Sequence, residues 1–167
     1  VELPASLLVV GAGAVGLEFG QTFARFGTRV TIVDASDRIA PLADAESSKT
    51  LAAAMVDEGI ELVTSAFVER VRRDGGEVIA TVAPRDGGEG HDVRAETVML
   101  ASGRVPNIEA LRLDEVGVET TRAGIAVDEH LRTTAAGIWA AGDVTAVAQF
   151  TPIAQYQARV AIADMFG

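Results

Sequence analysis

Residues 7–16, LLVVGAGAVG, decide the fold of this 167-residue chain. An apolar run of this kind is typical of a buried parallel strand, and the three glycines after it stand at the spacing G-x-G-x-x-G. Apolar side chains then recur at helical spacing, at Val15, Phe19, Phe23 and Phe26. The stretch therefore predicts a strand over residues 6–12, a glycine turn, and a helix over residues 14–26 that ends at Gly27.

The next segments continue the alternation of strand and helix. Residues 29–34, RVTIVD, are rich in β-branched side chains and predict a strand that closes on Asp34. A loop marked by Pro41 leads into a helical pattern over residues 43–58, and residues 60–64 predict a third strand. This β-α-β-α-β order is half of a doubly wound parallel sheet.

After the third predicted strand, the pattern of apolar and polar residues changes. Glycine-rich turns at residues 74–76 and 85–90 separate short alternating runs at 67–73, at 77–84 and around Val93. Such runs predict an antiparallel meander. The expected fold class is therefore α/β, with a Rossmann-like doubly wound parallel sheet and an antiparallel β-meander.

The last third of the chain predicts shorter elements. A buried strand is expected at residues 97–101, and short strands are expected at 125–127 and 138–141. Thr151 as N-cap and Pro152 at the first helical position predict a final helix. Its apolar face is expected to carry Tyr156, Val160 and Ala163.

Composition excludes several classes of function. The formal net charge is −10, so association with nucleic acid or an anionic membrane surface is disfavoured. The chain has no cysteine, hence no disulfide, thiolate metal site or thiol nucleophile, and His91 and His130 lack ligand-like spacing. No apolar run reaches the ~18 residues of a membrane span, and no signal peptide is seen. We expect a cytoplasmic protein without a metal, and Val1, followed almost at once by a strand, indicates a piece of a longer chain.

The glycine motif with its flanking elements predicts a dinucleotide site. Gly11 permits the tight turn, Gly13 lets the backbone approach a pyrophosphate, and Gly16 allows helix and strand to pack closely. The helix N-terminus offers free N–H groups and a positive dipole to the phosphates. The alternatives are a purely structural turn or a site for another nucleotide such as S-adenosylmethionine.

Asp34 indicates which dinucleotide is bound. It follows Gly11 by 23 residues, where a carboxylate would bond the ribose hydroxyls of NAD. A 2′-phosphate there would meet like charge, so NADH is favoured over NADPH. Arg38 either reaches such a phosphate or is a solvated loop cation.

Four further motifs carry a family resemblance. They are SGRVPN at 102–107, LDEVGVE at 113–119, GIWAAGD at 137–143 and FTPI at 150–153. In this order they resemble the pyridine nucleotide-disulfide oxidoreductases, which include dihydrolipoamide dehydrogenase, mercuric reductase and glutathione reductase. The resemblance covers all 167 residues.

The resemblance implies two cofactors. In that family an NAD domain is inserted into an FAD domain, so residues 1–104 would be the NAD(H)-binding domain and residues 105–167 the C-terminal part of the FAD-binding domain. Glu18 would lie near the nicotinamide, Val68 beside the adenine and Gly103 beside the cofactor. The full set implied for NAD is Gly11, Ala12, Gly13, Ala14, Val15, Gly16, Glu18, Asp34, Val68 and Gly103.

For FAD, the resemblance implies that Asp143 bonds a ribityl hydroxyl and that Gly142 lets the flavin come close. The helix that begins near residue 150 would point its N-terminus at the flavin, where the dipole stabilises negative charge. That segment consists of Phe150, Thr151, Pro152 and Ile153. The plainer alternatives are a turn residue for Asp143, a cap for Thr151, a solvated carboxylate for Glu18 and a structural role for Arg104.

Two departures from the family pattern bear on function. Ala14 stands where glutathione reductase has a flavin-shielding tyrosine, which implies a more open nicotinamide pocket. The redox cysteine pair, the first adenosine-binding glycine motif and the C-terminal His-Glu pair are absent, and the family places them outside this region. No catalytic residue is therefore assigned.

The predicted function is the NAD- and FAD-binding part of a homodimeric flavoprotein that passes hydride from NADH to FAD and on to a disulfide or similar acceptor. By itself this part is expected to be inactive and colourless. The alternatives are a cysteine-independent NADH:quinone reductase or NADH oxidase, or a non-catalytic dinucleotide-binding module.

Overall fold

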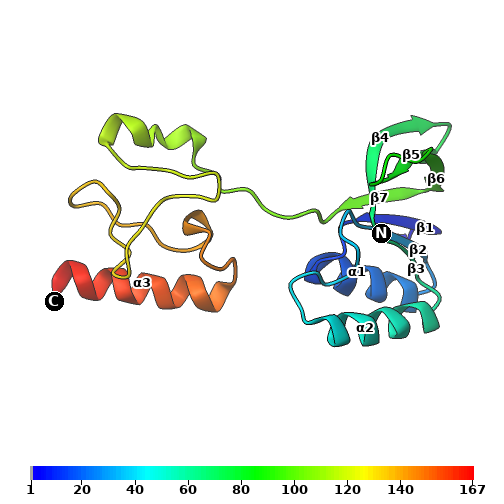
Figure 1. The fold of residues 1–167 in the computed structure, drawn as a ribbon, viewed down its shortest axis with the longest axis horizontal. Helices are drawn as coiled ribbons and strands as arrows, with labels where there is room; N and C mark the ends of the chain where they lie inside the picture. The colour runs from blue at the N-terminus through cyan, green and yellow to red at the C-terminus, as the bar shows by residue number, and fades with distance from the viewer. Residues whose placement is uncertain (1) are drawn as a thin grey trace. The chain divides into compact units, whose positions relative to one another are not determined.

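The computed structural model describes residues 2–167, which form two compact units that divide between Gly103 and Arg104 (Figure 1). The elements of the first unit are β1 (Ser6–Val10), α1 (Ala14–Arg25), β2 (Arg29–Val33), α2 (Ala45–Asp57), β3 (Glu61–Val63), β4 (Ala66–Asp74), β5 (Glu77–Pro84), β6 (His91–Ala95) and β7 (Thr97–Leu100). Those of the second unit are the 3-10 turns η1 (Glu109–Leu111), η2 (Leu113–Val116) and η3 (Asp143–Thr145), and the helix α3 (Thr151–Phe166).

The first unit is built on a four-stranded parallel sheet in the order β3-β2-β1-β7. Leu7 of β1 pairs with Val30 of β2 on one side and with Thr97 of β7 on the other. The strand expected at residues 97–101 is thus present, but as an edge strand whose Leu100 is 75% exposed rather than buried.

Alternate residues of the sheet enter two different cores. Leu7 and Val9 face a cluster that includes Leu17 of α1 and Met55 of α2. Leu8 faces the opposite cluster, which contains residues of the antiparallel sheet β4-β5-β6. Figure 1 shows α1 and α2 on one side of the parallel sheet and the meander on the other. The predicted α/β fold class and meander are confirmed.

Helix α1 packs against the sheet through two glycines and through Leu17, with Phe23 beside them. Its buried residues are Gly16, Leu17 and Gly20, whereas Val15 and Phe19 are 45% and 49% exposed. A Cβ at Gly20 would lie 2.8 Å from Cδ1 of Ile32, so a larger residue there would have to displace the Ile32 side chain. The predicted helix is correct, but of its apolar stripe only Phe23 packs against the core.

The second unit is organised by α3 and a small core of Val118, Ile125 and Ala140. The prediction of strands at 125–127 and 138–141 is wrong, because neither segment forms a regular strand. Each is reduced to a single bridge, Thr120 with Ile125 and Arg132 with Trp139. Most of this unit consists of loops, and its backbone hydrogen bonds are made in turns rather than between regular strands.

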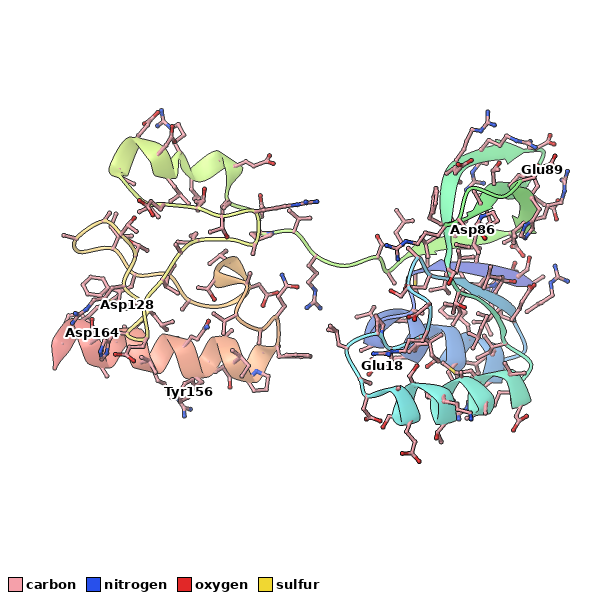
Figure 2. The ribbon with its side chains drawn as sticks, viewed as in Figure 1. Glu18, Asp86, Glu89, Asp128, Tyr156 and Asp164 are labelled. Carbon is pink, nitrogen blue, oxygen red and sulfur yellow. The ribbon has the colours of Figure 1, made fainter. Side chains whose placement is uncertain are left out.

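The inward face of α3 also differs from the expected one. Tyr156 is 66% exposed and points away from the body of the unit (Figure 2), and Ala163 is exposed. The buried positions are Gln157 and Ala161. Among residues 2–167, no helix combines the length and apolar composition needed to cross a bilayer.

Candidate functional site

The glycine turn between β1 and α1 has three distinct geometries. Gly11 has a φ of +110°, and a Cβ there would lie 2.4 Å from the carbonyl oxygen of Ala101. A Cβ on Gly16 would lie 1.9 Å from the carbonyl oxygen of Gly11. In contrast, apart from Gly13 itself and its two chain neighbours, no heavy atom of the described residues lies within 4 Å of a Cβ built on Gly13. Two glycines are required by packing, and the third faces open space that a ligand would use.

The N-terminus of α1 faces the same turn without a protein cap. Gly13 is the N-cap residue, and no side chain within residues 2–167 caps it. The first-turn residues Ala14 and Val15 are exposed, and the first turn carries no acidic residue. Unpaired N–H groups and the helix dipole make this end a suitable place for an anion. Glu18 lies exposed on the same helix (Figure 2).

Asp34 connects the end of β2 to the glycine turn. Its Oδ2 accepts a hydrogen bond from the backbone N–H of Ala12 at 2.6 Å, and its Oδ1 accepts one from Ser36 at 2.7 Å. The half-buried carboxylate therefore holds the backbone of the glycine turn at Ala12. Each oxygen keeps a lone pair for a further donor such as a ribose hydroxyl.

Arg38 is not a solvated loop cation. Its Nη2 donates to the carbonyl oxygens of Pro41 and Ala43 at 3.2 and 3.3 Å, and its Nε is buried without a hydrogen-bond partner among the described residues. The side chain thus holds the loop between β2 and α2 together. The alternative in which it reaches a 2′-phosphate would have to use the N–H groups outside these two contacts, or break them.

Val68 and Gly103 lie apart from the turn in the sequence and have separate surroundings. Val68 is half-buried on β4 beside a register shift and packs against the core that contains Leu8 and Val33. Gly103 is exposed, with a φ of +118°, just after β7. Packing therefore explains Val68 without any ligand.

In the second unit the candidate site is the turn Gly142–Thr145. Gly142 has φ +85° and ψ −156°, a conformation that favours glycine, and a Cβ there would approach that of Ala154 to 3.5 Å. The side chain of Asp143 is 49% exposed, and its nearest cation is Arg104 Nη1 at 3.8 Å. Arg104 also donates to the carbonyl oxygen of Gln149 at 3.0 Å, which gives it the expected structural role.

Helix α3 begins one residue earlier than predicted. Phe150 is the N-cap, with an extended backbone and a carbonyl that accepts from Ala154 N–H at 3.0 Å. Thr151 is therefore the first helical residue and makes no cap, and Pro152 is the second. The prediction of Thr151 as N-cap is wrong because the N-cap is the residue whose carbonyl accepts the first helical hydrogen bond, and that residue is Phe150. Ile153 is half-buried, and the other three residues of this segment are exposed.

Sequence reasoning missed Gln157. This residue is 5% exposed and accepts a hydrogen bond from the backbone N–H of Gly142 at 2.7 Å. The only available signal was spacing, because Gln157 lies at helical intervals between Ala154 and Ala161. Within the described residues, no group of three or more acidic or histidine side chains could hold a metal ion.

A separate polar cluster fastens the far end of α3. Asp164 accepts from Arg132 Nε at 2.6 Å and from Trp139 Nε1 at 2.8 Å. The guanidinium of Arg132 first, and then the indole N–H, hold the pKa of Asp164 below its usual range. His130 lies 3.8 Å from the same carboxylate. This cluster anchors the loop of residues 128–139 to the helix.

Comparison with known proteins gives the family. The family model described as pyridine nucleotide-disulphide oxidoreductase matches residues 1–158. The chain is 37% identical to a mercuric reductase of Bacillus cereus and to a dihydrolipoyl dehydrogenase of Mycobacterium bovis, over 99% of its own length in each case. The chain belongs to the pyridine nucleotide-disulphide oxidoreductase family, which confirms the resemblance.

Solved structures agree with this assignment. The flavoprotein disulfide reductase RclA from Escherichia coli matches with a TM-score of 0.89 and 33% identity, and LpdA from Mycobacterium tuberculosis with 0.90 and 34%. Each match covers 99% of this chain, but only 37% and 35% of the solved chains. The chain likewise spans only part of its sequence relatives: 26% of the mercuric reductase and 36% of the dihydrolipoyl dehydrogenase.

Proposed function

We propose that this chain is the NADH-binding domain and the C-terminal part of the FAD-binding domain of a flavoprotein oxidoreductase. Two features support the first assignment: the open space at Gly13 and the uncapped N-terminus of α1. The exposed carboxylate of Asp143, on a glycine turn at the start of η3, supports the second. Family membership supports both cofactors together.

The chain's own residues would bind and orient these cofactors. The first-turn amides of α1 would hold the pyrophosphate, while Asp34 would accept from the adenosine ribose and disfavour a 2′-phosphate by like charge. Asp143 would accept from a ribityl hydroxyl, and the N-terminus of α3 would stabilise negative charge on the flavin. When bound, NADH supplies a hydride, FAD accepts it, and the electrons pass on to a disulfide or a similar acceptor.

The remaining assignments are carried by analogy rather than by contacts. Glu18 would lie near the nicotinamide, and Val68 and Gly103 would line the cofactor. The homodimer and the cytoplasmic location remain predictions, as does the absence of nucleic-acid and membrane partners. The net charge of −10 supports the last of these.

The test uses the full open reading frame that contains these residues. The purified protein should be yellow, with flavin absorbance near one FAD per chain, and anaerobic NADH should bleach it faster than NADPH does. A protein that takes up no FAD when titrated would overturn the proposal. The 167-residue chain alone should bind NADH and no FAD, and tightly bound yellow flavin in that preparation would refute the assignment of the second unit as an incomplete FAD site.

A further inference from the structure

Gln157 carries the most informative buried contacts of the second unit. A buried amide must find partners, because an unpaired one costs free energy that the fold would have to offset. Gln157 lies on the inward face of α3, next to the point where Ala154 approaches Gly142. An alanine or a leucine would pack at this helix–turn contact without any such requirement.

The partners of Gln157 form a closed ring of hydrogen bonds. The N–H of Gly142 donates to Gln157 Oε1 at 2.7 Å, and Gln157 Nε2 donates to Thr145 Oγ1 at 3.3 Å. Thr145 Oγ1 in turn donates to the carbonyl oxygen of Gly142 at 2.9 Å. Each hydrogen is used once and all three bonds are buried. One side chain thus holds both ends of the turn Gly142–Thr145.

The turn that the ring holds presents Asp143. Its backbone is unusual at both ends, with φ +85° at Gly142 and φ +54° at Ala146. Backbone of this kind persists only where its surroundings impose it. The Asp143 side chain is half exposed, with Arg104 Nη1 at 3.8 Å as its one ion-pair partner among the described residues, so the turn sets where its carboxylate lies.

We propose that Gln157 is a positioning residue that sets Asp143 for the ribityl chain of bound FAD. The inference rests on the proposed function, since it needs FAD to occupy this turn. Gln157 touches the backbone of the turn and not Asp143 itself, so it acts through the aspartate.

A double-mutant cycle tests this relation in the full open reading frame, with FAD as the titrated ligand. Gln157→Met keeps the length of the side chain but offers Gly142 no acceptor. We expect it and Asp143→Ala each to weaken FAD binding about tenfold, the effect of one well-placed hydrogen bond to a charged group. The double variant should bind like Asp143→Ala alone, because the two residues act in series. Losses that multiply to about a hundredfold would overturn the proposal.

Two further variants control for folding. Gln155→Met changes an exposed glutamine of the same helix and should leave FAD affinity unchanged. Gln157→Glu offers the same acceptor and donor as glutamine only when protonated. When ionised, the glutamate still accepts from the Gly142 N–H but can no longer donate to Thr145. Its FAD affinity, relative to wild type, should therefore be close to one at low pH and fall as pH rises, by less than the loss in Gln157→Met.

The outcomes separate this proposal from the one on which it rests. If the wild type takes up no FAD, the proposed function fails and the role of Gln157 fails with it. Equal affinities of Gln157→Met and Gln155→Met, with FAD bound by the wild type, would overturn the positioning role alone. If Gln157→Met does not fold, the pH profile of Gln157→Glu decides, and a profile parallel to wild type refutes the proposal.

Discussion

Gly13 and Gly16 allow binding and folding to be perturbed separately. A Cβ on Gly16 would lie 1.9 Å from the carbonyl oxygen of Gly11 and 3.3 Å from Cγ1 of Val9. Both neighbours belong to the turn and the central strand, so α1 would have to move outward by about 1 Å to relieve the overlap. Displacements of packed backbone cost about 1–3 kcal/mol or more. We expect Gly16→Ala to lower the free energy of unfolding of the first unit by at least about 2 kcal/mol.

Gly13→Ala should behave in the opposite way. The residue has φ −75° and ψ 179°, which alanine adopts freely, and the space around its Cβ is open. The free energy of unfolding should stay within about 0.5 kcal/mol of wild type or rise slightly, through the less flexible unfolded chain. NADH affinity should fall about tenfold or more, or by about 1.4 kcal/mol, because the added methyl group occupies the approach of the pyrophosphate.

The assay must report on the first unit alone. The chain's one tryptophan, Trp139, and the long helix α3 both lie in the second unit, so the unfolding of the first unit in urea is best followed by amide exchange in β1. NADH binding is measured by the change in nicotinamide fluorescence. Wild-type NADH affinity in Gly13→Ala would refute the assignment of the turn to the pyrophosphate. Wild-type stability in Gly16→Ala would refute the packing argument.

Three other changes have defined outcomes. Asp34→Ala removes the acceptor of two backbone N–H groups and should lower the free energy of unfolding by about 1–3 kcal/mol. It should also reduce the affinity for NADH more than the affinity for NADPH. Equal losses of affinity in titrations with the two cofactors would contradict the charge argument. Arg38→Ala should lower the free energy of unfolding by about 1 kcal/mol, while leaving the ratio of NADH affinity to NADPH affinity unchanged; a shifted ratio would mean that this side chain also meets the 2′-phosphate. Because the folded pKa of Asp164 is lowered by Arg132, its contribution is complete above the ordinary aspartate pKa of about 3.9 and is lost as pH falls through the lower folded value. The free energy of unfolding, measured by Trp139 fluorescence, should therefore fall less steeply at acid pH in Asp164→Asn than in wild type. An unchanged fall would show that the ion pair does not cause the acid sensitivity.

Much of the first unit was predictable because its signals are local. The apolar run before Gly11 and the β-branched run before Asp34 each define a strand without reference to the rest of the chain. The packing of α1 was not predictable in this way. Leu17 and Phe23 pack against the core, whereas Val15, Phe19 and Phe26 are exposed. The close contacts of α1 with the glycine turn and β2 are made at Gly16 and Gly20. Hydrophobicity at helical spacing therefore does not by itself identify the buried face.

The second unit was predicted less well because its order depends on tertiary contacts. Residues around Ile125 and Ala140 are apolar and look like strands, yet each enters a shared core while making a single bridge. The buried amide of Gln157 has the same origin, as its partner is the backbone N–H of Gly142, fifteen residues away. Family resemblance supplied the candidate Asp143, but only the three-dimensional structure shows what holds its turn.

The position of β1 has a consequence for synthesis of the chain. The inner strand β1 pairs with β7, and Ser6 Oγ accepts a hydrogen bond from the backbone N–H of Glu96, ninety residues further on. On the ribosome, β1, β2 and β3 are complete well before β7 emerges, so one edge of β1 lacks its partner while the meander is translated. At about 5–20 residues per second this delay is roughly 2–7 s. An apolar strand edge that is open for this time can pair with another nascent chain, so the risk of aggregation is greatest before folding ends.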